Sequence, residues 1–154
     1  MLTLLLALLL QQPAGLPSPQ RIWEAPLRSR ALSVSLAPSG MCTAVLRQAS
    51  VEVRNEAGQR VWASPVSVDP QDADWSRIVI SPQCDWTATS INRSGRPPVL
   101  HIFHKDGFRA FLSLDGMLGL QPNGTNVSSL AISPDGKLLA VGFEGGLLWI
   151  VGKN

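Results

Sequence analysis

One stretch decides the fold, because it places two strand-like segments on either side of a turn: Leu130-Ala131-Ile132-Ser133-Pro134-Asp135-Gly136-Lys137-Leu138-Leu139-Ala140-Val141-Gly142. Apolar residues alternate with period two on both sides of the turn, which is typical of half-buried strands. Pro134 cannot donate a hydrogen bond to a strand ladder, so it marks the end of the first strand. Gly136 suits the turn that follows. The stretch therefore predicts a β-hairpin.

The same strand-to-proline anchor occurs twice more, at Val34-Ser35-Leu36-Ala37-Pro38 and at Ile78-Val79-Ile80-Ser81-Pro82. Gly40 matches Gly136, whereas Cys84 stands at that place in the second copy. A small residue recurs in the strand after each turn: Ala44, Ala88 and Ala140. Recurring identities indicate stacked repeats, and the small residue indicates that neighbouring sheets approach closely.

Each copy continues beyond the hairpin. A third strand is expected at 51–53, 100–102 and 148–150, and a fourth at 58–62 and 107–111. The third copy supplies three strands before Asn154. Its missing fourth strand has a counterpart near the start of the chain, since Gln20-Arg21-Ile22-Trp23 matches Gln59-Arg60-Val61-Trp62. We therefore expect one repeat to be split between the two termini.

The segment from Ser133 to Gly142 resembles the first hairpin of WD40 and YVTN-type β-propeller repeats. The Gly-His and Trp-Asp dipeptides of WD40 repeats are absent. The resemblance implies an all-β chain in which residues 20–154 form about three four-stranded antiparallel propeller blades, the last split between the termini. A β-sandwich of short strands is the alternative, but it does not predict repeating identities.

The first 19 residues are predicted to be an export signal. Leu2 to Leu10 is an apolar run too short to span a bilayer, and the polar and small residues Gln11 to Gly15 follow it. The alternatives are a buried N-terminal helix or a misplaced start codon. A secreted or periplasmic location is expected, with membrane association only through this signal. Cys42 and Cys84 occupy unequal repeat positions, so two free, buried thiols are predicted in preference to a disulfide.

No catalytic, cofactor or metal site is predicted. The net charge of +2 has interspersed signs, which argues against a nucleic-acid partner. His101 and His104 lie three residues apart in a strand, so their side chains point to opposite faces and cannot chelate one metal. The acidic residues Asp69, Asp72 and Asp74 lack the spacing of a calcium loop. No nucleophile or phosphate-binding motif is present, and a non-enzymatic role follows.

The connections between strands two and three and between successive repeats should share one end of the stack, because turns in an antiparallel meander alternate between ends. Function concentrates on long loops carried by a rigid scaffold. This end is the predicted surface for a protein partner, with these candidate residues: Asp69, Asp72, Asp74, Trp75, Asn92, Arg93, Arg96 and Asn123. A lectin-like propeller is the alternative, although Trp75 has no clear counterpart in the other connections.

Closed propellers typically have four to eight blades, and three are too few to close a ring. A homodimer that completes a six-bladed ring is therefore expected. The alternative is that the chain is a truncated fragment of a larger propeller, since Asn154 falls where a turn and a fourth strand should follow.

Overall fold

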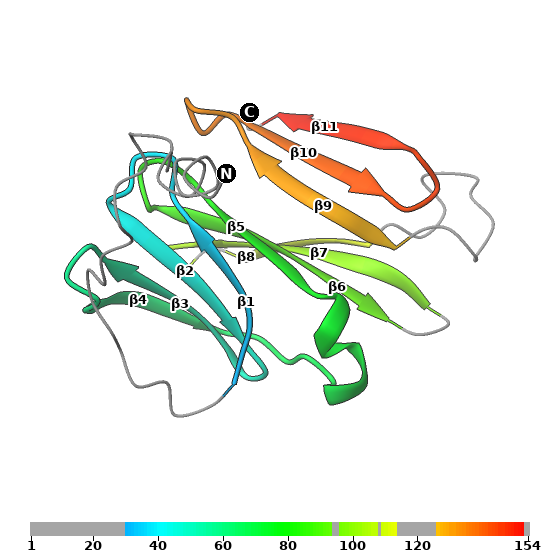
Figure 1. Cartoon of the computed structure of the whole chain (residues 1–154), viewed down its shortest axis with the longest axis horizontal. Helices are drawn as coiled ribbons and strands as arrows, with labels where there is room; N and C mark the ends of the chain where they lie inside the picture. The colour runs from blue at the N-terminus through cyan, green and yellow to red at the C-terminus, as the bar shows by residue number, and fades with distance from the viewer. Residues whose placement is uncertain (1–29, 94–95, 108, 114–125, 153–154) are drawn as a thin grey trace, which may run out of the picture.

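The computed structural model describes residues 30–93, 96–107, 109–113 and 126–152. This part of the chain is all-β apart from one short 3-10 helix, and no helix within it is long and apolar enough to cross a membrane. The strands form three separate antiparallel sheets, which we call the first, second and third blades (Figure 1).

Strand order within each blade follows the chain. The first blade has the order β1-β2-β3-β4, the second β5-β6-β7-β8, and the third β11-β10-β9. The predicted fold class is confirmed. The export signal and the strand expected at Gln20-Arg21-Ile22-Trp23 lie outside the described residues. The elements are β1 Ala31–Leu36, β2 Cys42–Arg47, β3 Ser50–Asn55, β4 Arg60–Pro65, η1 Pro70–Trp75, β5 Arg77–Ile80, β6 Trp86–Arg93, β7 Arg96–His104, β8 Arg109–Ser113, β9 Val127–Ile132, β10 Leu138–Phe143 and β11 Leu148–Gly152.

The blades pack face to face, and their first strands, β1, β5 and β9, are neighbours (Figure 1). One core cluster joins the first blade to the second and another joins the second to the third. Ala44 and Ala88 are fully buried in these two clusters. Their small side chains allow the close sheet approach that the repeat predicted.

The first hairpin has the same hydrogen bonds in all three blades. The amide of Gly40 donates to the carbonyl of Ala37 at 2.8 Å, and Gly136 donates to Ser133 at 2.8 Å. Cys84 donates to Ser81 at 3.0 Å and has a φ of 63°, so a cysteine adopts the left-handed backbone that glycine adopts in the other copies. The second turn therefore keeps the geometry of the repeat despite its different residue.

The turn of the third blade is closed by a carboxylate. The Ser133 hydroxyl donates to Asp135 Oδ1 at 2.5 Å, and the Lys137 amide donates to the same oxygen at 3.1 Å. These bonds favour the charged form of the carboxyl, and they lower the pKa of Asp135 below its usual value, the Ser133 bond contributing most. The Ser-Pro-Asp-Gly-Lys segment thus stabilises its own turn.

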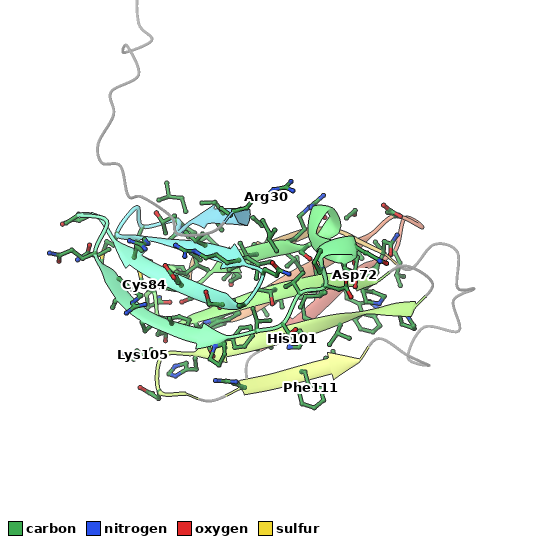
Figure 2. All side chains as sticks on the ribbon, turned by 90° about the horizontal axis from the view of Figure 1, so that it is seen from below. Arg30, Asp72, Cys84, His101, Lys105 and Phe111 are labelled. Atoms are coloured by element: carbon green, nitrogen blue, oxygen red, sulfur yellow. A yellow bond between two sulfur atoms is a disulfide. The ribbon has the colours of Figure 1, made fainter. Side chains whose placement is uncertain are left out.

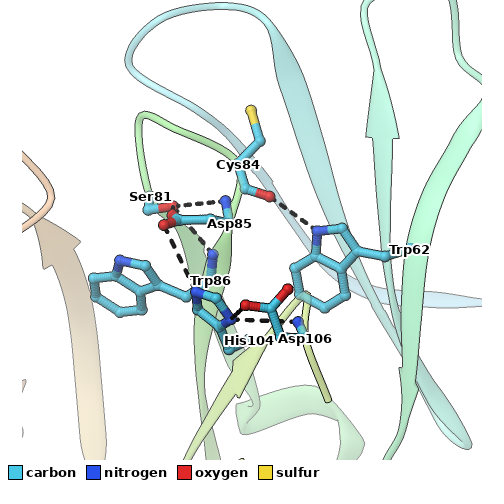
Figure 3. A network of polar contacts seen from close by, with 7 residues as sticks. All are labelled: Trp62, Ser81, Cys84, Asp85, Trp86, His104 and Asp106. Atoms are coloured by element: carbon cyan, nitrogen blue, oxygen red, sulfur yellow. Dashed lines mark hydrogen bonds and ion pairs between the residues drawn. The ribbon is translucent and has the colours of Figure 1, made fainter. Parts of the chain in front are cut away.

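Cys42 and Cys84 form a disulfide with their Cα atoms 6.1 Å apart, so the prediction of free thiols is wrong. Cys42 begins β2 of the first blade, and Cys84 lies in the first turn of the second blade. Stacking brings these unequal repeat positions together. Two side-chain hydrogen bonds cross the same junction. The Ser39 hydroxyl donates to the Pro82 carbonyl at 2.8 Å. The Trp62 indole donates to the Cys84 carbonyl at 2.9 Å (Figure 3).

We predict that removal of the disulfide destabilises the pair of blades it joins. Cys42→Ala should lower the free energy of unfolding by about 2 to 4 kcal/mol, because the bridge closes a long loop in the unfolded chain. Denaturant unfolding of oxidised and reduced protein measures this.

Cys84→Gly is the matched control for the same bridge. It removes the disulfide but also relieves the positive φ, so its cost should be smaller than that of Cys84→Ala. Equal stability of the oxidised and reduced proteins would contradict the prediction.

Candidate interaction surface

The stack of blades has two ends. The turn end carries the hairpin between the first and second strands of all three blades, and the hairpin between the third and fourth strands of the first and second blades. The loop end carries the remaining connections, which hydrogen bond to one another. The amides of Val66 and Val68 donate to the carbonyls of Ala49 and Gln48 at 3.2 and 2.9 Å, and Glu144 donates to Asn126 at 3.0 Å. Each of these bonds holds a connection of the loop end against another segment of the same blade.

Three of the predicted acidic residues lie at the loop end, at or within η1. Asp69 is exposed, and its Oδ1 accepts a hydrogen bond from the Gln71 amide at 3.0 Å. Asp72 is half-buried, and its carbonyl accepts from the Ser76 hydroxyl at 3.1 Å (Figure 2). Asp74 and Trp75 belong to the same helix by their backbone. No group of three metal-ligating side chains occurs among the residues the structure describes.

Asn92 has a structural role at this end. It is only 3% exposed, its Nδ2 donates to the Val127 carbonyl at 2.9 Å, and its Oδ1 accepts from the Val127 amide at 2.9 Å. The side chain at the end of β6 therefore satisfies both backbone groups of the first residue of β9, in the next blade. These two bonds occupy the amide of Asn92 between two blades and remove it from the surface available to a partner.

The structure describes the remaining candidate residues to different extents. Arg93 and Arg96 oppose each other in the β6–β7 ladder, at the loop end of the second blade. Asn123 lies outside the described residues. Glu144 was not predicted; it is exposed in the β10–β11 turn, and its Oε2 accepts from Asn126 Nδ2 at 3.1 Å. The glycines after it gave only a turn signal, which does not point to binding.

The turn end carries a polar network around His104 (Figure 3). His104 Nε2 lies 3.8 Å from Asp85 Oδ2, and its Nδ1 lies 3.1 Å from Asp106 Oδ2. The Ser81 hydroxyl donates to Asp85 Oδ1 at 2.5 Å and so is bonded to the carboxylate and not to the imidazole. A nucleophilic serine needs a base within hydrogen-bond reach. This network braces two hairpins and lacks the order of a catalytic triad.

The two histidines lie on opposite faces of β7, as predicted. His101 stacks on Phe103 with ring centroids 5.9 Å apart, at the face that packs on the first blade. His104 instead borders a cavity of about 170 Å³ between the second and third blades. That cavity is lined mainly by Trp86, Ile102, Leu139 and Val151, which belong to the core cluster between those blades.

Comparison with solved structures identifies the fold as a β-propeller. Hsv2 from Kluyveromyces lactis matches with a TM-score of 0.55 and 15% identity over 80% of this chain and 33% of its own length. The Dos1 propeller matches with a TM-score of 0.54 and 10% identity over 77% of this chain and 29% of its own. The chain thus spans about a third of the length of these propellers.

The comparisons define the fold and leave the activity open. A Bacteroides uniformis protein provisionally assigned as a 6-phosphogluconolactonase also matches, with a TM-score of 0.50 and 19% identity over 79% of this chain and 35% of its own. No protein-family model matches the chain, and no curated protein matches it in sequence. Fold alone does not determine function.

We predict that Asn92 holds the second and third blades together. Asn92→Ala should lower the free energy of unfolding by about 1 to 3 kcal/mol, because it leaves both buried backbone groups of Val127 without a partner. Thermal and denaturant unfolding measure the loss. Asn92→Asp is the matched control, since it keeps the acceptor and replaces only the donor. Full stability of Asn92→Ala would show that the two bonds are dispensable.

Proposed function

We propose that the chain is an exported, non-enzymatic β-propeller module of the WD40 or YVTN type that binds a protein partner through its loop end. The observation that carries the proposal is the exposure of Asp69 and Glu144 on connections that are hydrogen bonded to rigid blades. Loops fixed in this way lose little conformational entropy on binding, so they can recognise a partner efficiently.

The exposed carboxylates of the loop end support a protein partner that offers basic groups to them. Asp69 and Glu144 are exposed to solvent, and Arg93 and Arg96 lie at the same end, so the loop end carries charges of both signs. Complementary charge on a partner would speed the encounter and set its orientation. The side-chain hydrogen bonds at Asp69 and Glu144 come from within the loop end and fix how the carboxylates are presented.

Export is supported by the disulfide as well as by the apolar run Leu2 to Leu10. Disulfides persist in secreted and periplasmic proteins and are rare in reducing compartments.

We predict that the protein fractionates with the envelope or the medium. Thiol labelling before cell lysis should find its Cys42 and Cys84 oxidised. Reduced protein with an intact Met1 in the cytosol would contradict export.

Binding through the loop end can be tested with charge-neutral variants. Asp69→Asn combined with Glu144→Gln removes two charges while keeping oxygen acceptors at both sites. After chemical cross-linking in the native envelope identifies a partner, this variant should bind it about 10-fold more weakly than the wild type, mainly through slower association at low salt.

The matched control lies at the turn end. Glu56→Gln combined with Asp106→Asn removes the same charge from exposed hairpins and should leave affinity unchanged. Equal losses in both variants would indicate a net-charge effect and not a loop-end interface. Binding to immobilised glycans in place of a protein would support the lectin-like alternative.

A further inference from the structure

The two junctions between blades differ in how their space is filled near the turn end. At the first junction, between the first and second blades, the indole of Trp62 in β4 packs against the core cluster and donates to the Cys84 carbonyl. At the second junction, between the second and third blades, a cavity of about 170 Å³ remains. Protein interiors hold few voids larger than a water molecule, so this cavity calls for an explanation.

Strand register shows that the cavity lies where Trp62 lies in the first junction. Val53 of β3 pairs with Trp62, and Ile102 of β7 pairs with Ala110. Val53 and Ile102 are equivalent, because each also pairs with the alanine that recurs in every repeat. Ala110 therefore occupies the position of Trp62, and Ile102 opposite it lines the cavity.

A β-bulge produces this difference between two similar strands. The local sequence Gly-x-Arg-x-aromatic ends at Trp62 in β4 and at Phe111 in β8. In β4, Trp62 and Arg60 oppose consecutive residues of β3, so Val61 is an extra residue. In β8 the pairing is continuous, and Phe111 opposes His101. A shift of one residue turns a side chain to the other face, so Phe111 points away from the cavity and is 75% exposed (Figure 2).

The size and lining of the cavity select a small aromatic occupant. Its walls are mainly the apolar side chains of Trp86, Ile102, Leu139 and Val151. Apolar cavities of about 150 Å³ stay dry and take up molecules such as benzene. Pockets for drug-sized ligands measure about 300 Å³ or more. The cavity therefore limits an occupant to one or two fused rings.

The third blade also repeats the hydrogen-bond acceptor that Trp62 uses. Gly136 and Cys84 occupy the same place in their turns, with φ angles of 72° and 63° and with amides that donate to Ser133 and Ser81. Gly136 is buried, and no residue in the described part of the chain donates to its carbonyl. Buried carbonyls are usually paired, so this one offers an acceptor to an N–H group in the cavity.

We propose that the cavity between the second and third blades is a binding site for a small planar aromatic molecule that carries an N–H donor, of the indole class. The ring takes the place that Trp62 fills in the first junction, and its N–H donates to the Gly136 carbonyl. Lys137 also lines the cavity, and an ammonium group near an aromatic ring favours that ring over an aliphatic group of equal size. The site lies at the turn end, so it is independent of a protein partner at the loop end.

The test is calorimetric titration of the purified protein with indole. Indole should bind saturably with one site per chain. Benzofuran keeps the fused-ring shape but replaces the N–H with an oxygen, so it should bind about 10-fold more weakly, because the Gly136 carbonyl is left without a donor. Equal affinity for the two compounds, or no binding of indole at millimolar concentration, would overturn the proposal.

Two tryptophan variants of β8 locate the site. Ala110→Trp places an indole on the cavity side of the strand, so it should weaken indole binding about 10-fold or more by filling the cavity from within the chain. Phe111→Trp is the matched control, since it places the same ring on the opposite face and should leave affinity unchanged. Formation of the Cys42–Cys84 disulfide shows that each variant has folded.

Two further results would contradict the assignment. Undiminished binding of indole to Ala110→Trp would place the ligand elsewhere on the protein. Binding of a tryptophan-containing peptide in the absence of any binding by free indole would mean that the cavity receives a side chain of another protein and not a small molecule.

Discussion

Every feature of this chain depends on the burial of one sheet face against the next sheet. The second blade is apolar on both faces, with Ile78 and Ile80 packed on the first blade and Ala88 and Leu100 packed on the third. A small sheet whose two faces are both apolar cannot bury either face by itself, so it requires a neighbouring sheet on each side. The alternation of turns within each blade then determines where the turn end and the loop end lie. The disulfide and the bonds of Asn92 to Val127 are consequences of this stacking.

The fold could be predicted because residue identities recur in each repeat and apolar residues alternate with period two in its strands. Gly40 and Gly136 marked their hairpins correctly, and the shared end of the connections followed from the alternation of turns. The disulfide was not predictable in the same way. Alignment of the repeats separates Cys42, at the start of a strand, from Cys84, in a turn. Only the stagger between stacked blades brings them within 6.1 Å, and a one-dimensional alignment carries no information on that stagger.

The position of the loop end followed from the sequence, whereas the placement of its individual side chains did not. Asp69 is exposed at the expected end, but Asn92 is buried and bonds to Val127, which is 35 residues away in sequence. An asparagine near a hairpin is equally suited to cap a turn, to bind a partner or to complete a neighbouring ladder, since its amide both donates and accepts. The choice among these roles depends on what the next blade places opposite it. Glu144, which belongs to the proposed surface, was not predicted because an exposed carboxylate in a turn is common, and its hydrogen bond from Asn126 appears only in the structure.

The two junctions within the chain differ in physical character. The junction between the first and second blades combines an apolar core with a disulfide and two side-chain hydrogen bonds, so it is the most constrained. The junction between the second and third relies on an apolar core and on the paired amide of Asn92. The face of the first blade that points away from the second carries Arg47, Glu52 and Arg54 at the positions where the second blade has Ile91, His101 and Phe103. On the second blade, Ile91 and Phe103 belong to the core cluster that joins it to the first blade. On the first blade, Glu52 instead lies 3.3 Å from an Arg47 nitrogen and 2.9 Å from an Arg54 nitrogen. Ion pairs that are already desolvated add little net free energy to packing, so this face lacks at those positions the apolar side chains on which both junctions within the chain depend.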